Sequence, residues 1–132
     1  MTSQDVENVM RTAHEKLLAV REQRVPVMVD DKVSADWNGL AISAFSRAGR
    51  ILSTPAYVQA ATRAADFISE EMVNNDDGVL MHTYKDGVTP VPGFLDDYAC
   101  MAWGLLELYQ AGHQVRHLRS GLHLVDQMVD LF

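Results

Sequence analysis

The chain has 132 residues, about half of them apolar, and its formal net charge is −7 at pH 7. This length is typical of one domain, and the apolar fraction is large enough to build a hydrophobic core. Acidic residues are spread along the chain, which argues against binding to nucleic acids or to anionic membranes. The composition therefore predicts a globular protein whose partner, if it has one, is neutral or cationic.

The single cysteine, Cys100, excludes an internal disulfide and a Cys-x-x-Cys redox pair. It lies in an apolar stretch, so an inert buried thiol is expected. The first ten residues, MTSQDVENVM, are polar and acidic and do not resemble a signal peptide. No apolar run approaches the ~20 residues that a membrane span requires. We therefore expect a cytoplasmic protein that binds neither nucleic acid nor membrane.

Five helices are predicted along the chain, and they alternate between two kinds. The helices over about residues 3–22, 55–73 and 115–132 each carry one apolar stripe at three- and four-residue spacing, which is typical of amphipathic helices. The helices over about residues 37–52 and 95–111 carry few charges, which predicts burial nearly all round.

A weak internal repeat relates the two apolar helices. Ala48-Gly49-Arg50 ends the first of them, and Ala111-Gly112-His113 ends the second. Each repeat consists of an apolar helix, a short connection and an amphipathic helix, and hairpins of this kind stack side by side. The sequence therefore predicts an all-α fold of two layers, with the apolar helices inside and the amphipathic helices outside.

Helices that alternate in direction place the N-termini of both inner helices on one rim. The long connections, residues 23–36 and 74–94, lead into these N-termini, and long ordered loops are often functional. Asp86-Gly87 in the second connection predicts a two-residue β-hairpin turn, and Gly39 allows close approach to the backbone. The residues expected to line a pocket for a small polar or sugar ligand at this rim are Asp30, Asp31, Lys32, Trp37, Asn38, His82, Tyr84, Asp96, Asp97 and Tyr98.

Three stretches resemble a known family: KLLAVREQRVPVMVDDKVSADWNGLAISAFSRAGR, YVQAATRAADFI and PGFLDDYACMAWGLLELYQAG. They resemble the spermatogenesis-associated, thioredoxin-domain-containing family, most firmly over residues 17–112. Full-length members join a thioredoxin-like domain to a C-terminal (α/α)6 barrel of the six-hairpin glycosidase type. The resemblance implies that residues 1–132 form a single fragment of such a barrel, without the thioredoxin-like domain. The fragment would hold about two and a half helical hairpins and one short β-hairpin.

The barrel is shared with sugar epimerases and glycosidases, so the resemblance implies, by analogy of fold, a carbohydrate-type pocket in the complete protein. No catalytic role is carried over, and the fragment alone is expected to be inactive. The alternative is a non-catalytic helical scaffold that positions a thioredoxin-like domain or a protein partner. An incomplete ring would also leave apolar flanks exposed, which predicts self-association.

The aspartates of the rim have two interpretations. Asp96 or Asp97, paired with Asp30, Asp31 or Asp36 across the mouth, would bring two carboxylates to the ~5–9.5 Å separation that glycosidases use. The competing and commoner role for an aspartate at a helix start is capping of free N–H groups, which also complements the helix dipole.

The other rim residues are equally open to two interpretations. Trp37 and Tyr98 either stack on a sugar ring or belong to the core. His82 either transfers protons near neutral pH or is an exposed strand residue without a role. Lys32 most simply pairs with a neighbouring carboxylate.

Metal and nucleotide sites are not predicted. His113 and His117 are four residues apart, as zinc ligands on one helix face can be, but no glutamate lies between them and no third ligand stands out. The chain also lacks a P-loop and a Rossmann fingerprint. We therefore expect no cofactor.

Overall fold

The structure is a computed structural model that describes residues 2–74 and 77–132. It consists of two compact units, one that ends at Asp30 and one that covers Asp31–Phe132. The single domain predicted over residues 1–132 stays a prediction. Among the described residues, no helix combines the length and the apolar character that a membrane span needs.

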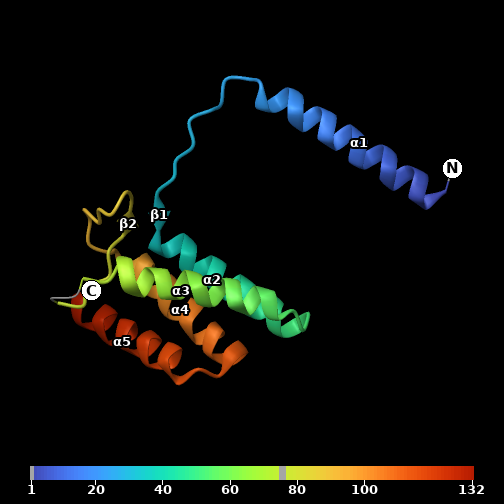
Figure 1. Ribbon diagram of the computed structural model, residues 1–132. Helices are drawn as coiled ribbons and strands as arrows, with labels where there is room; N and C mark the ends of the chain where they lie inside the picture. The colour runs from blue at the N-terminus through green and yellow to red at the C-terminus, as the bar shows by residue number, and fades with distance from the viewer. Residues whose placement is uncertain (1, 75–76) are drawn as a thin grey trace. The chain divides into compact units, whose positions relative to one another are not determined.

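The first unit contains α1, Ser3–Glu22, as the apolar stripe predicted (Figure 1). Thr2 and Asp5 form a capping box, in which Thr2 Oγ1 accepts from the Asp5 amide at 3.2 Å and Asp5 Oδ2 accepts from the Thr2 amide at 2.8 Å. These hydrogen bonds lower the pKa of Asp5. No residue of α1 is buried within this unit, so its apolar stripe is exposed.

The second unit consists of two helical hairpins joined by residues 72–94 (Figure 1). The first hairpin is formed by α2, Ala35–Ile51, and α3, Pro55–Glu71. The second is formed by α4, Leu95–Gly112, and α5, Val115–Leu131. The predicted helices are therefore confirmed, with ends that differ by one or two residues.

The two inner helices, α2 and α4, run parallel. Near their N-termini the Asp36 amide donates to Asp97 Oδ1, and near their C-termini the Arg50 guanidinium donates to Gln110 Oε1. Between these contacts Gly39 packs directly on the α4 backbone. The predicted common rim is thus confirmed, and the close approach predicted at Gly39 is made by the backbone of α4.

The core lies between the inner helices and the outer helices α3 and α5. Ile42 of α2 and Ile68 of α3 are buried in it, together with Met101 and Leu105 of α4 and Leu124 of α5. The prediction that α2 and α4 are buried nearly all round was wrong. Each exposes one side where the described part of this unit provides no covering helix; the large apolar residues on these sides include Trp37, Leu40 and Trp103.

The predicted β-hairpin is present, and it pairs with the other long connection. Asp86 and Gly87 both have positive φ, and Lys85 and Val88 exchange two backbone hydrogen bonds across this turn. β2, Thr83–Tyr84, pairs antiparallel with β1, Val33–Ser34. The hairpin is therefore fixed at the rim where α2 begins.

Candidate functional site

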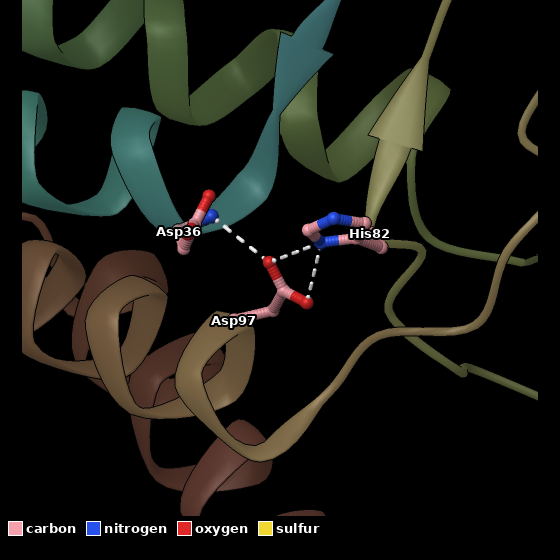
Figure 2. Close-up of side chains that lie close together, drawn as sticks. All are labelled: Asp36, His82 and Asp97. Carbon is pink, nitrogen blue, oxygen red and sulfur yellow. Dashed lines mark hydrogen bonds and ion pairs between the residues drawn. The ribbon is translucent and has the colours of Figure 1, made fainter.

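Asp97 is the centre of the candidate site, and its side chain is only 1% exposed. Oδ1 accepts a hydrogen bond from the Asp36 amide at 3.1 Å, and Oδ2 accepts one from the Phe94 amide at 2.8 Å. His82 Nδ1 lies 3.0 Å from Oδ1 and 2.9 Å from Oδ2 (Figure 2). One carboxylate therefore joins the start of α2, the start of α4 and the β-hairpin.

The position of Asp97 follows from its place in the first turn of α4. From that position a carboxylate can reach back to the amide that precedes the helix, as the bond to Phe94 shows. The same carboxylate reaches α2 because Gly39 allows the two helices to approach closely. The capping role considered for Asp97 is thus observed, and it extends to a second helix.

His82 is held from several sides. Its backbone amide donates to the Val91 carbonyl at 2.8 Å, and its carbonyl accepts from the Ala35 amide at 2.9 Å. Its ring meets Phe94 edge-on, with 5.0 Å between the ring centroids. Because the two Asp97 oxygens already accept N–H donors, we assign the Nδ1 proton to the bond with Asp97, which leaves Nε2 as an acceptor in the neutral ring.

Asp36 orders the start of α2. Its Oδ1 accepts from the Trp37 amide at 2.7 Å and from the Ser34 hydroxyl. Asn38 contributes a bond from Nδ2 to the Ser34 carbonyl at 2.8 Å. Within the second unit, Asp36 rather than Asp31 is therefore the aspartate that lies beside Asp97.

Asp36, His82 and Asp97 present ligand atoms that lie within 4.8 Å of one another, a spacing that a metal ion can bridge. However, each oxygen of Asp97 already accepts a backbone N–H. The N-termini of α2 and α4 also carry partial positive charge, which disfavours a cation. We therefore assign these three residues a hydrogen-bonding role.

Two tyrosines predicted at the pocket belong to the core instead. Tyr98 is 0% exposed, and its hydroxyl accepts from the Leu80 amide at 3.1 Å, so its ring is not available for stacking on a ligand. Tyr84 is half-buried and packs edge-on against Phe67 of α3, with 5.1 Å between ring centroids. Strand alternation predicted that Tyr84 and His82 share one face of the hairpin. In the structure, Tyr84 instead packs against the outer helix α3.

The remaining predicted residues are exposed or only partly buried. Trp37 is 74% exposed in the first turn of α2, and Asp96 is exposed in the first turn of α4. Asp31 forms an ion pair with Lys85 of the hairpin at 2.5 Å, and this partner lowers the pKa of Asp31. Lys32 is exposed in the same connection, whereas Asp30 belongs to the first unit.

Sequence reasoning missed Phe94 at this rim and the exposed Trp103, which lies about two turns further along α4. Phe94 supplies both an amide to Asp97 and a ring to His82, and no sequence signal marks that role. Trp103 of α4 is 47% exposed, seven residues after Asp96. Two helical turns separate positions seven apart, so this spacing could have placed Trp103 on the same face as Asp96.

The two-hairpin arrangement defines the class of the fold. It is similar to cellobiose 2-epimerase from Bacillus thermoamylovorans B4167, with a TM-score of 0.68 and 22% identity over 76% of this chain and 26% of that chain. It is also similar to cellobiose 2-epimerase from Spirochaeta thermophila DSM 6192, with a TM-score of 0.64 and 17% identity over 75% of this chain and 25% of that chain. The chain is thus part of an all-α (α/α)6 barrel of the six-hairpin glycosidase-like type.

Proteins of similar sequence define a narrower group than the proteins of similar fold do. The chain is 36% identical to spermatogenesis-associated protein 20 of Rattus norvegicus and 33% identical to that of Homo sapiens, in both cases over 96% of this chain. It spans 17% of the length of these relatives. No family model matches the chain. The predicted resemblance is nevertheless confirmed, because the chain is homologous to a segment of spermatogenesis-associated protein 20.

Proposed function

We propose that the complete protein binds a carbohydrate-type ligand at the rim where α2 and α4 begin, and that His82 transfers protons there. The observation that carries the proposal is the bond from His82 Nδ1 to the buried Asp97 carboxylate at 2.9 Å. A carboxylate in this position fixes the tautomer of the imidazole and stabilises the imidazolium that forms when Nε2 takes a proton. The similarity to cellobiose 2-epimerases supports a sugar as the ligand class.

Exposed residues at the same helix starts supply the groups that a sugar requires. Trp37 offers an apolar ring face to the C–H groups of a pyranose. Asp96 offers a carboxylate that can accept hydrogen bonds from sugar hydroxyls. Because this chain spans only 17% of the length of its relatives, other parts of the complete protein would supply the rest of the pocket.

A scaffold role is the second candidate, and one observation favours it. Asp97 receives two backbone amides in addition to His82, so it already links three segments without any ligand. In this alternative, His82 only completes the hydrogen bonding of a buried carboxylate and fixes the hairpin to the helices.

The two candidates are separated by His82→Gln in the full-length protein, because the Gln amide can still donate to Asp97 but cannot exchange protons near neutral pH. Binding of a monosaccharide and disaccharide panel would be followed by calorimetry, and conversion of bound sugars by NMR. We expect sugar binding to persist and conversion to fall ~10²-fold or more. The exposed His14→Gln is the matched control.

Absence of binding by any sugar in the panel would reject the ligand class. A bound and converted sugar whose turnover is unchanged in His82→Gln would reject the proton-transfer role. A variant that only melts at a lower temperature, with no sugar bound by either protein, is the result that the scaffold candidate predicts.

A further inference from the structure

Phe94 immediately precedes α4, and backbone hydrogen bonds fix its position beside His82. The His82 amide donates to the Val91 carbonyl at 2.8 Å, and the Gly93 amide donates to the Leu80 carbonyl at 2.7 Å. These two bonds pair the segment that leads into Phe94 antiparallel with the segment that carries His82. The main chain therefore places the two residues next to each other before their side chains make any contact.

The backbone and the side chain of Phe94 make different contacts. The backbone amide donates to Asp97 Oδ2 at 2.8 Å. The ring meets the imidazole of His82 edge-on, with 5.0 Å between the centroids and 63° between the ring planes. Any residue except proline can supply the amide, whereas only an aromatic side chain can supply the ring contact. The aromatic character of residue 94 therefore matters to His82 rather than to Asp97.

The imidazole of His82 is only partly sheltered where it binds Asp97. Nδ1 lies 2.9 Å and 3.0 Å from the two carboxylate oxygens, yet 29% of the histidine side chain is exposed (Figure 2). Water competes for a hydrogen bond at such a position. A ring packed against the imidazole restricts the side-chain torsions of His82 and keeps water away from the bond.

We propose that Phe94 is a positioning residue of the proton-transfer site, whose ring keeps His82 in the orientation in which Nδ1 binds Asp97 and Nε2 faces the ligand. The inference rests on the function proposed above for His82. Phe94 itself exchanges no proton. Because Phe94 is 55% exposed, it buries little apolar surface, and its loss should have a small effect on global stability.

The first test needs no sugar and measures solvent exchange of the His82 Nδ1–H by NMR in the 132-residue chain. Phe94→Ala retains the backbone amide that binds Asp97 and removes the ring. We expect Nδ1–H exchange to become about tenfold faster, while exchange of the His82 backbone amide, which is bonded to Val91, stays unchanged.

Two further variants complete this measurement. Phe94→Tyr retains the ring and should exchange as slowly as wild type. Phe94→Leu keeps an apolar side chain without a ring and should exchange faster than wild type, so it decides the matter even if Phe94→Ala does not fold. Equal Nδ1–H exchange in wild type and in the variants without a ring would overturn the proposal.

The second test measures conversion of the monosaccharide and disaccharide panel by the full-length protein. Phe94→Ala should lower kcat about tenfold and leave KM nearly unchanged, because the ring orients His82 and does not hold the sugar. Phe45→Ala is the matched control, since Phe45 is 43% exposed and its ring meets only Tyr57 among the described aromatic residues, at 5.7 Å. Equal losses of kcat in the two variants would contradict positioning. If wild type converts no sugar, the proposed function fails, and the exchange measurement still decides the role of Phe94.

Discussion

Gly39 of α2 faces the backbone of Cys100 in α4, so closely that a Cβ on Gly39 would lie 2.4 Å from the Cys100 carbonyl carbon. A Cβ on Gly104 would in turn lie 2.6 Å from the Gly39 carbonyl oxygen. These two glycines set the distance between the inner helices. The distance in turn allows Asp97 to reach the Asp36 amide, so the candidate site depends on a backbone contact one turn away.

Gly39→Ala should therefore destabilise the protein. The new methyl group would meet backbone atoms, which cannot move aside as a flexible side chain can, so the helices must separate. We expect the free energy of unfolding to fall by about 2–3 kcal/mol, as for other overpacked sites, measured by urea denaturation. Gly112→Ala is the control, because its nearest neighbouring atom is 3.8 Å away, and it should be close to neutral. Equal effects of the two changes would show that helix propensity, not the contact, governs Gly39.

Asp97→Asn should lower the free energy of unfolding by more than the loss of a simple helix cap would. The amide has one acceptor oxygen, whereas the carboxylate accepts from the Asp36 amide, the Phe94 amide and His82. Leaving a buried donor unsatisfied costs ~1–3 kcal/mol, so we expect a loss of about that size in the free energy of unfolding. Asp96→Asn, an exposed change in the same turn, should cost less than about 0.5 kcal/mol. A loss equal to that of Asp96→Asn would contradict the role of Asp97 as a link between segments.

Much of the fold could be predicted from the sequence because its signals are local. Apolar periodicity located the five helices, and the Asp86-Gly87 pair located the hairpin turn. The parallel direction of α2 and α4 followed from the alternation of two kinds of helix. The close approach to the backbone predicted at Gly39 is also observed, but the sequence did not show that the approaching group is the backbone of α4.

The site was harder to predict because it depends on which side chains meet. His82 and Asp97 lie in different elements, and no spacing rule pairs them; only the register of the hairpin against α2 and α4 brings them together. For Tyr98, a helix start suggested the rim, but a position one residue further along points about 100° away, into the core. Cys100, expected to be buried, is only partly so, and burial with nearby carboxylates raises its pKa.

The exposed side of α2 should mediate self-association of the 132-residue chain. Trp37, Leu40, Ala44 and Ile51 follow one another at helical spacing and are all exposed. Apolar stripes of this kind tend to find a partner. We expect sedimentation velocity to show concentration-dependent association at tens of micromolar, about the concentration at which weak interfaces of this type form. The double substitution of Leu40 and Ile51 by Lys should leave a monomer, whereas Leu122→Lys on α5 should not. A wild-type chain that sediments as a monomer throughout would contradict this expectation.

His117 should make the protein less stable in mild acid. Its side chain is 3% exposed on α5, and neither ring nitrogen has a hydrogen-bond partner among the described residues. Burial, with the adjacent Arg116 guanidinium, lowers the pKa of His117, and Asp66 of α3 opposes this effect only in part. The folded protein therefore keeps the imidazole neutral at a pH where the unfolded chain protonates it.

The sign of the effect follows from the difference in bound protons. Above the unfolded-state pKa of ~6.5 both states hold a neutral His117, so the residue does not alter stability. As the pH falls from there toward the lower folded-state pKa, His117 binds a proton in the unfolded state but not in the folded state. The free energy of unfolding therefore decreases. Below the folded-state pKa the loss stays constant. Urea midpoints measured between pH 7.5 and 5 should therefore fall more steeply for wild type than for His117→Leu, while the exposed His14→Leu should follow wild type. Parallel profiles for wild type and His117→Leu would assign the acid sensitivity to other groups.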